Sequence, residues 1–256
     1  MLNVKQRYRF KKLFKAIATG RKTQDDYAWE YYSELYEDGL EDVARKHTLA
    51  LRPGDYSFRK GCLVPEGGIL PLHQNYQIIY ETILQLNPDS VLEVGCGCGD
   101  HLHNLQILAP HIRLAGCDIS QGQIDFLQRK HPDLIARTAV HDIRVSPPPL
   151  GIDSVHVIFT QAVIMHIRKH QGRALANLFR MATRQVILME NWLRHDFLGE
   201  IRTLSRAGEI PWEKIFFYYR EAGIPPKPHL MIVSATELAY PELSDYRTLA
   251  DTVAGI

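Results

Sequence analysis

One segment of the sequence carries most of the information about the architecture: Val91-Leu92-Glu93-Val94-Gly95-Cys96-Gly97-Cys98-Gly99-Asp100. A hydrophobic run typical of a buried strand leads directly into three glycines at alternate positions, and a helical pattern follows. Glycine lets the backbone turn tightly and approach a bound molecule where a Cβ atom would not fit. The segment therefore predicts a ligand-binding loop between a strand and a helix.

The spacing of these glycines separates the ligands that such a loop can hold. A dinucleotide-binding loop needs G-x-G-x-x-G, whereas here the third glycine comes one residue early and Asp100 stands where the last glycine is required. A carboxylate at a helix N-terminus disfavours a phosphate there, so a nicotinamide-dependent oxidoreductase is a remote alternative. A P-loop is excluded because no Gly-Lys-Ser/Thr follows.

Around this loop, short apolar runs alternate with amphipathic helical patterns, which indicates a parallel sheet covered by helices. The predicted strands span residues 90–94, 112–118, 134–140, 154–160 and 185–190, and the predicted helices span residues 74–86, 100–109, 121–130, 167–182 and 193–207. Residues 214–220 and 229–235 predict a hairpin at the sheet edge, although the periodicity of residues 212–221 also fits a helix. The expected fold is α/β: a doubly wound, mostly parallel seven-stranded sheet (Rossmann-like) with a C-terminal antiparallel hairpin and an N-terminal helical cap.

Charge is distributed unevenly along the chain. Residues 1–22 carry eight basic side chains and no acidic one, whereas the remaining residues include 22 basic and 29 acidic side chains. Phe10, Leu13, Phe14 and Ile17 form one apolar helical face in this basic segment. Two interpretations stay open: a helix that docks on an anionic membrane surface or an acidic partner, and a helix packed on its own domain.

Composition also sets the expected domains, compartment and partners. We expect a basic helix and helical, loop-rich cap in residues 1–73, a ligand-binding domain in residues 74–240 and a tail in residues 241–256. The sequence shows neither a run of about 18 apolar residues nor a secretory signal, so we expect a cytoplasmic protein, with peripheral contact at the inner face of a membrane as the open alternative. Four cysteines with a single C-x-C pair predict no metal site. No nucleic-acid partner is expected, because the body of the chain is acidic.

The glycine loop matches the motif acidic-x-G-x-G-x-G in full, and here the chain resembles the class I S-adenosylmethionine-dependent methyltransferases. The resemblance covers about residues 74–192 well and residues 214–235 loosely. It implies S-adenosyl-L-methionine as cofactor and S-adenosyl-L-homocysteine as product. It also implies a cofactor loop formed by Glu93, Gly95, Cys96, Gly97 and Gly99, in which the cysteines are small fillers.

Other positions resemble the family in the same order, each after a predicted strand. Asp118 matches the acidic residue that accepts hydrogen bonds from the ribose hydroxyls, with Ile119 beside the adenine. Asp142, followed by Ile143, resembles the acidic position that meets the adenine amino group. Taken singly, each aspartate also fits an ordinary helix cap. The order of the matches favours a cofactor site at the carboxyl edge of the sheet.

The methionine end of the cofactor is expected beside Thr160 and Gln161, with Tyr76 as part of a lid. The family's reaction is an in-line displacement, so the protein mainly aligns and desolvates the reactants, and a base is needed only where the acceptor must lose a proton. Three residues near the carboxyl ends of the fourth and fifth predicted strands are candidate catalytic bases: His166, His195 and Glu190. A histidine such as His166 also fits a helix cap, and the sequence does not separate the candidates.

The residues after the fourth predicted strand constrain the acceptor. No Asp/Asn-Pro-Pro-aromatic sequence stands there, which argues against methylation of a base amino group in nucleic acid. We expect a small-molecule or sugar/glycan acceptor, with a hydroxyl oxygen preferred over nitrogen. A non-catalytic cofactor-binding protein and a membrane- or partner-docking protein on the same fold stay open as alternatives.

Overall fold

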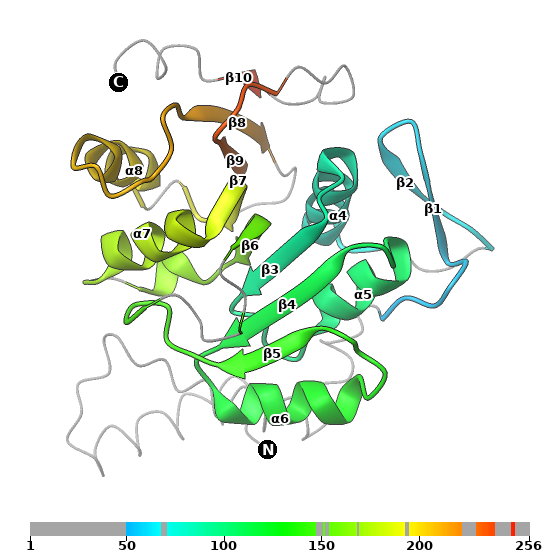
Figure 1. Ribbon diagram of the computed structural model, residues 1–256. Helices are drawn as coiled ribbons and strands as arrows, with labels where there is room; N and C mark the ends of the chain where they lie inside the picture. Colours follow the sequence, from blue (N-terminus) through cyan, green and yellow to red (C-terminus); the bar gives the residue numbers. More distant parts are fainter. Residues whose placement is uncertain are drawn as a thin grey trace, which may run out of the picture.

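A computed structural model describes residues 50–67, 71–146, 151, 154–167, 169–192, 195–221, 229–238 and 247–248. Its centre is an eight-stranded sheet with the order β10-β8-β9-β7-β6-β3-β4-β5 (Figure 1). The strands are β3 (Ser90–Val94), β4 (Arg113–Asp118), β5 (Arg137–Val140), β6 (Val155–Gln161), β7 (Ala182–Glu190), β8 (Phe216–Glu221), β9 (His229–Ser234) and β10 (Arg247–Thr248). The helices are α4 (Gln74–Leu86), α5 (Asp100–Leu108), α6 (Gln121–Lys130), the 3₁₀ helix η1 (Ile164–His166), α7 (Gln171–Met181) and α8 (Phe197–Arg206).

The order of the strands locates the place where a ligand binds in such a sheet. Strands β5, β4, β3, β6 and β7 are parallel, and β9 and β8 add an antiparallel hairpin at the edge of β7. From β3 the chain moves outward to β4 and β5, and it then returns to β6 on the other side of β3. The crevice at the carboxyl ends of β3 and β6 is therefore the topological switch point, where open α/β sheets bind ligands.

Helices cover both faces of the sheet (Figure 1), and a separate hydrophobic cluster lies between the sheet and the helices on each face. On one face α4, α5 and α6 pack against alternate strand residues such as Val91 and Phe159, and on the other α7 and α8 pack against Leu92 and Ile158. Side chains of successive strand residues point to opposite faces, so a strand covered on both sides is apolar throughout. All five residues of β3 are buried, the polar Ser90 and Glu93 included.

The predicted fold class is confirmed, with additions at both ends. The two-residue strand β10, which pairs with β8, lies in the segment that the sequence assigned to a tail. A separate hairpin, β1 (Tyr56–Arg59) and β2 (Cys62–Pro65), lies where the sequence predicted only loops. Its two-residue turn has positive φ at both Lys60 and Gly61, the conformation that matches the twist of a tight hairpin. The predicted basic helix and residues 1–49 of the predicted cap lie outside the described residues.

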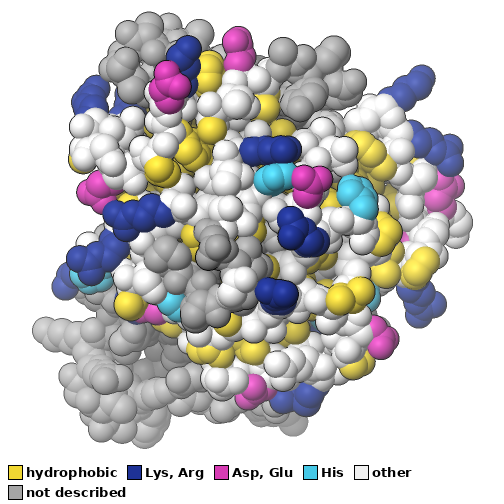
Figure 2. Space-filling model, viewed as in Figure 1, with side chains coloured by type: hydrophobic (Ala, Val, Ile, Leu, Met, Phe, Trp, Pro, Cys, Tyr) yellow, Lys and Arg dark blue, Asp and Glu magenta, His cyan; other side chains and the backbone are white. Residues whose placement is uncertain are grey.

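Basic and acidic side chains are interspersed over the face shown in Figure 2, with hydrophobic areas between them. Within the described ranges, no helix is long and apolar enough to cross a membrane.

Candidate functional site

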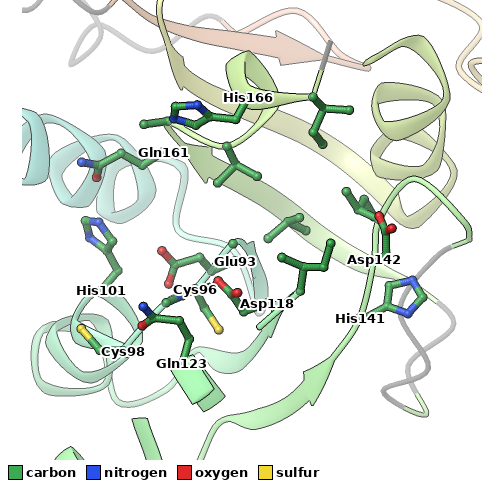
Figure 3. A pocket seen from close by; sticks show the side chains of 18 of the residues that line it. Glu93, Cys96, Cys98, His101, Asp118, Gln123, His141, Asp142, Gln161 and His166 are labelled. Carbon is green, nitrogen blue, oxygen red and sulfur yellow. Dashed lines mark hydrogen bonds between the residues drawn. The ribbon is translucent and has the colours of Figure 1, made fainter. Parts of the chain in front are cut away.

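A cavity of about 370 Å³ opens at the switch point, with walls contributed by the loops after β3, β4, β5 and β6 (Figure 3). This is within the range of small-molecule sites. Most of the predicted cofactor residues line it: Tyr76, Glu93, Gly95, Cys96, Gly97, Asp118, Ile119, Asp142, Ile143 and Gln161. Of the three candidate bases, only His166 does so.

The glycine loop forms the floor of this pocket. The amide nitrogens of Gly95 and Cys96 both donate to the Cys117 carbonyl, at 2.7 and 3.0 Å, which ties the loop to the end of β4. Gly95 has φ +78°, and a Cβ atom there would lie 2.2 Å from Cγ2 of Val163. The position therefore requires glycine, because both the backbone conformation and the approach of Val163 exclude a side chain.

Gly99 serves a different purpose from the one expected. It does not line the pocket; it precedes α5 with φ +79°, and a Cβ atom would meet Leu127 of α6 at 2.5 Å. The third glycine therefore allows α5 and α6 to pack closely, and it contributes to the cofactor loop only indirectly.

Asp118 is positioned by two backbone amides. Its Oδ2 accepts from the Gly97 nitrogen at 3.0 Å, and its Oδ1 accepts from the Ser120 nitrogen at 2.9 Å. Burial raises the pKa of Asp118, although these hydrogen bonds oppose the effect. A carboxylate oxygen has room for a further donor beyond one amide, so Asp118 is suited to accept hydrogen bonds from a ligand's hydroxyls.

Glu93 lies beside Asp118 in the middle of the pocket (Figure 3) and is only 1% exposed. Its Oε2 is buried and has no hydrogen-bond partner among the residues that the structure describes. Burial raises the pKa of Glu93 well above its usual value, and the nearby Asp118 and Asp100 raise it further. A buried carboxylate without a partner is costly, so this site favours a ligand that brings positive charge or a hydrogen-bond donor.

The right-hand end of the pocket in Figure 3 is formed after β5. Arg144 binds Asp142 through Nε at 2.9 and 3.0 Å and through Nη2 at 2.7 Å. Burial favours the neutral form of Asp142, but Arg144 outweighs it and lowers the pKa. The Arg144 guanidinium therefore already binds much of the Asp142 carboxylate, the group that the family resemblance expects to meet the adenine amino group. Ile119, 44% exposed, and the buried Ile143 supply apolar surface beside it.

The opposite end contains a residue that sequence reasoning missed. His101, in the first turn of α5, lines the pocket and lies beside Gln161 at the same end (Figure 3). Its ring lies 4.4 Å from the Tyr76 ring, edge to face. Burial lowers the pKa of His101 to about 4, against smaller opposing effects of Asp100 and Gln161. The imidazole is therefore neutral near pH 7. Apart from the His101 ring, whose pKa Gln161 raises by hydrogen bonding, the buried Oε1 of Gln161 has no hydrogen-bond partner among the described residues.

Two predicted residues lie beneath the pocket and hold one of its walls. The Glu190 carboxylate accepts from the Thr160 hydroxyl at 2.7 Å and from the backbone amides of Val163, Ile164 and Met165 at 3.0–3.1 Å. Both Glu190 and Thr160 are buried and neither lines the pocket. In this arrangement Glu190 positions the loop after β6, including the valine that packs on Gly95.

The two histidine candidates are separated by the structure. His166, at the end of η1, lines the pocket opposite Cys98 and Gln123 (Figure 3). His195 does not line it, and its ring stacks on Phe197 at the start of α8, with ring centroids 5.3 Å apart.

The first residue of α5, Asp100, is an acid that pairs with two basic side chains. Its carboxylate binds Lys130 at 2.7 Å and His131 at 2.7 Å, both at the end of α6. Burial alone would raise its pKa, but His131 and Lys130 outweigh this and lower the pKa of Asp100 to about 2. The residue fastens α5 to α6 behind the glycine loop. Among the residues that the structure describes, no group of three or more His, Cys, Asp or Glu side chains is arranged to hold a metal ion.

Comparisons with known proteins agree with this architecture. Residues 91–185 match the family described as "Methyltransferase domain". A TehB-like SAM-dependent methyltransferase from Corynebacterium glutamicum has a similar structure, with 15% identity and a TM-score of 0.52 over 81% of this chain and 99% of that one. The CMeT domain of the citrinin polyketide synthase gives 18% identity and a TM-score of 0.51 over 64% and 52% of the two chains. At such identities the likeness establishes the fold.

A third structure, an O-methyltransferase from a trans-AT polyketide synthase of Brevibacillus brevis in complex with S-adenosyl-L-homocysteine, gives 22% identity and a TM-score of 0.37 over 41% of this chain and 36% of that one. The chain spans about half the length, or less, of the citrinin and Brevibacillus proteins. Curated proteins give no match.

The matched residues 91–185 contain the glycine loop, Asp118, Asp142 and Gln161, and these side chains line one cavity. The sheet that carries them has its central strands in the doubly wound order on both sides of β3. Residues 91–185 therefore match a methyltransferase domain, and the chain has the fold of the S-adenosylmethionine-dependent methyltransferases that it resembles.

Proposed function

We propose that this protein binds S-adenosyl-L-methionine in the cavity at the switch point and transfers its methyl group to a hydroxyl oxygen of a small-molecule or sugar/glycan acceptor. The observation that supports the proposal most strongly is the Glu93 carboxylate, buried in the pocket with an Oε2 that lacks a partner. A positively charged ligand relieves the cost of that burial, whereas a phosphate-bearing ligand increases it.

The residues of the pocket fit the parts of such a cofactor. Asp118 is suited to the ribose hydroxyls because its carboxylate lines the cavity and can accept hydrogen bonds beyond those from the backbone amides that position it. Ile119 and Ile143 offer apolar contact for the adenine. When bound, the cofactor supplies an electrophilic methyl group on a sulfonium centre. The protein's contribution is then to exclude water and align the acceptor with that methyl group.

His166 is our candidate general base. It is the candidate that lines the cavity, and its imidazole is able to take the proton from an acceptor hydroxyl as the new bond to carbon forms. The charges of the pocket also favour release of the product. S-Adenosyl-L-homocysteine lacks the positive charge of the sulfonium, so Glu93 and Asp118 attract it less strongly than the cofactor.

The test is a methyl-transfer assay that detects S-adenosyl-L-homocysteine with a panel of hydroxyl-bearing small molecules and glycans. We expect turnover with at least one acceptor, and a 100-fold or greater fall in kcat for His166→Ala, within the range of about 10²–10⁴ that general base catalysis contributes. His195→Ala is the matched control and should keep kcat within about twofold of the wild-type value, because His195 lies outside the cavity. Unchanged kcat in His166→Ala would remove the base from the mechanism.

A further inference from the structure

The neutral His101 is part of a hydrogen-bonded chain that begins at a backbone amide outside the pocket. The Leu51 nitrogen donates to Oδ1 of Asn104 at 2.8 Å, and Nδ2 of Asn104 donates to the Tyr80 hydroxyl at 3.0 Å. The Tyr80 hydroxyl lies 2.8 Å from Nδ1 of His101. Leu51, Tyr80 and Asn104 are all buried.

The direction of every bond in this chain follows from its first member. A backbone N–H only donates, so the Asn104 atom that faces Leu51 is the carbonyl oxygen and the NH₂ group faces Tyr80. The Tyr80 oxygen accepts from that NH₂ group and has a single proton to give. Among the described residues, Nδ1 of His101 is the acceptor within reach of this proton. A buried hydroxyl that fails to donate a hydrogen bond costs the fold about 1–3 kcal/mol of stability.

This direction decides the tautomer of His101. Because Nδ1 accepts from Tyr80, the proton of the neutral imidazole is on Nε2. The ring thus presents a hydrogen-bond donor toward Gln161, which raises the pKa of His101 by hydrogen bonding and whose buried Oε1 has no other partner among the described residues. One end of the pocket therefore holds a donor, Nε2–H of His101, and an acceptor, Oε1 of Gln161, close together (Figure 3).

This pair complements the two charged groups of an α-amino acid: the donor suits a carboxylate, and the acceptor suits an ammonium group. It lies at the end of the pocket opposite Asp142, with Asp118 between the two ends (Figure 3). If the proposed function holds, a cofactor with its ribose at Asp118 and its adenine toward Asp142 directs its amino-acid group to His101. We propose that Tyr80 and Asn104 are positioning residues that lock His101 as an Nε2–H donor for the carboxylate of the cofactor.

The Asn104→Asp variant tests this positioning role of Tyr80 and Asn104. In Asn104→Asp the introduced carboxylate accepts both from the Leu51 amide and from the Tyr80 hydroxyl, so the direction of the chain reverses. The Tyr80 oxygen then accepts from Nδ1–H of His101, and Nε2 becomes a bare acceptor that repels a carboxylate. A nearly isosteric change two steps from the ligand is thus expected to weaken binding of the amino-acid group alone.

The experiment compares two nucleosides by calorimetric titration of the full chain: S-adenosyl-L-homocysteine, and 5′-methylthioadenosine, which lacks the amino-acid group. We expect His101→Gln and Asn104→Asp to weaken binding of S-adenosyl-L-homocysteine by about 10- to 100-fold, the usual worth of a hydrogen bond to a charged group. Both variants should bind methylthioadenosine within about twofold of wild type, which also verifies that the pocket is folded. Asp118→Ala should weaken both nucleosides.

The matched control is His111→Gln. His111 contacts Oδ1 of Asn87 at 3.1 Å and does not line the pocket, so neither affinity should change. The tautomer is read independently by ¹⁵N NMR of the histidine rings in the ligand-free protein, where His101 should carry its proton on Nε2 in wild type and on Nδ1 in Asn104→Asp.

An Nδ1–H tautomer of His101 in the wild type would overturn the proposed positioning role of Tyr80 and Asn104. Equal weakening of both nucleosides, or of neither, in His101→Gln and Asn104→Asp would overturn the role at the carboxylate while leaving the cofactor proposal intact. A wild-type protein that binds neither nucleoside would instead refute the proposed function, and the ligand role of His101 with it.

Discussion

Removal of the Glu190 side chain tests whether this carboxylate is a structural brace or a catalytic base. Two of its donors, the Thr160 hydroxyl and the Ile164 amide, belong to residues with no exposed surface. A buried donor left without an acceptor costs about 1–3 kcal/mol, so Glu190→Ala should lose about 2–6 kcal/mol of unfolding free energy. Glu190→Gln should lose only about 1–3 kcal/mol, because its amide oxygen still accepts three of the four bonds and its NH₂ group opposes the Met165 amide.

Urea unfolding at pH 7, followed by circular dichroism, measures these losses. A domain has about 5–15 kcal/mol of stability, so Glu190→Ala should shift the midpoint strongly or fail to fold, and Glu190→Gln provides the measurable intermediate. The brace would be refuted if Glu190→Gln kept the wild-type midpoint and slope and still lost methyl transfer. That result would return Glu190 to the candidate bases.

Three further perturbations follow from the structure. Gly95→Ala should weaken S-adenosyl-L-homocysteine binding at least tenfold in calorimetry, because a left-handed backbone costs about 1–2 kcal/mol for alanine and the new Cβ overlaps Val163. Adding Val163→Ala should recover part of the lost affinity. No recovery would mean that the contact with Val163 is unimportant. Asp100→Asn should lose about 2 kcal/mol of unfolding free energy at pH 7, since the folded pKa of Asp100 is about 2 against an ordinary value of 3.8. The stability that this lowered carboxylate pKa contributes is fully present above about pH 4 and is lost as the pH falls toward 2. The difference in unfolding free energy between Asp100→Asn and wild type should therefore shrink in that window, and a difference independent of pH would contradict the ion pairs. Deletion of residues 1–22, with their eight basic side chains, should reduce co-sedimentation with anionic lipid vesicles if this segment docks on membranes, and equal binding by both forms would end that hypothesis.

The central sheet was predictable because its strands are covered on both faces. The strand Ser90–Val94 has an apolar run, Val91-Leu92, at its centre and is followed directly by glycine, so both its position and its bounds can be recognised. The hairpin β1–β2 was missed because its four-residue strands carry no sustained alternation, and its burial depends on distant partners. One of these is Glu81 of α4, whose Oε1 accepts from the Leu63 amide at 2.9 Å.

The pocket was predictable where it depends on the backbone alone. The loop residues Gly95 and Gly97 and the carboxylate Asp118 stand at strand ends, and the carboxyl ends of parallel strands meet in space. Orientation was not predictable: Glu190 stands at a strand end too, but its side chain turns under the loop that it holds.

His101 was missed for the opposite reason. It lies on a helix, and its approach to the pocket depends on how α5 rotates against α4 and on a partner, Tyr80, distant in sequence. The signal available was weak: a histidine in the first turn of the helix directly after a cofactor loop.

The most direct measurement is calorimetric titration of the wild-type protein and Asp118→Ala with S-adenosyl-L-methionine and S-adenosyl-L-homocysteine, with NAD as the control ligand. We expect about micromolar binding of both sulfur nucleosides, no binding of NAD, and affinities about 10- to 100-fold weaker in Asp118→Ala, in line with hydrogen bonds to a charged acceptor. A folded protein that binds neither nucleoside, or an Asp118→Ala variant that binds them as tightly as wild type, would contradict the assignment of this pocket to the cofactor.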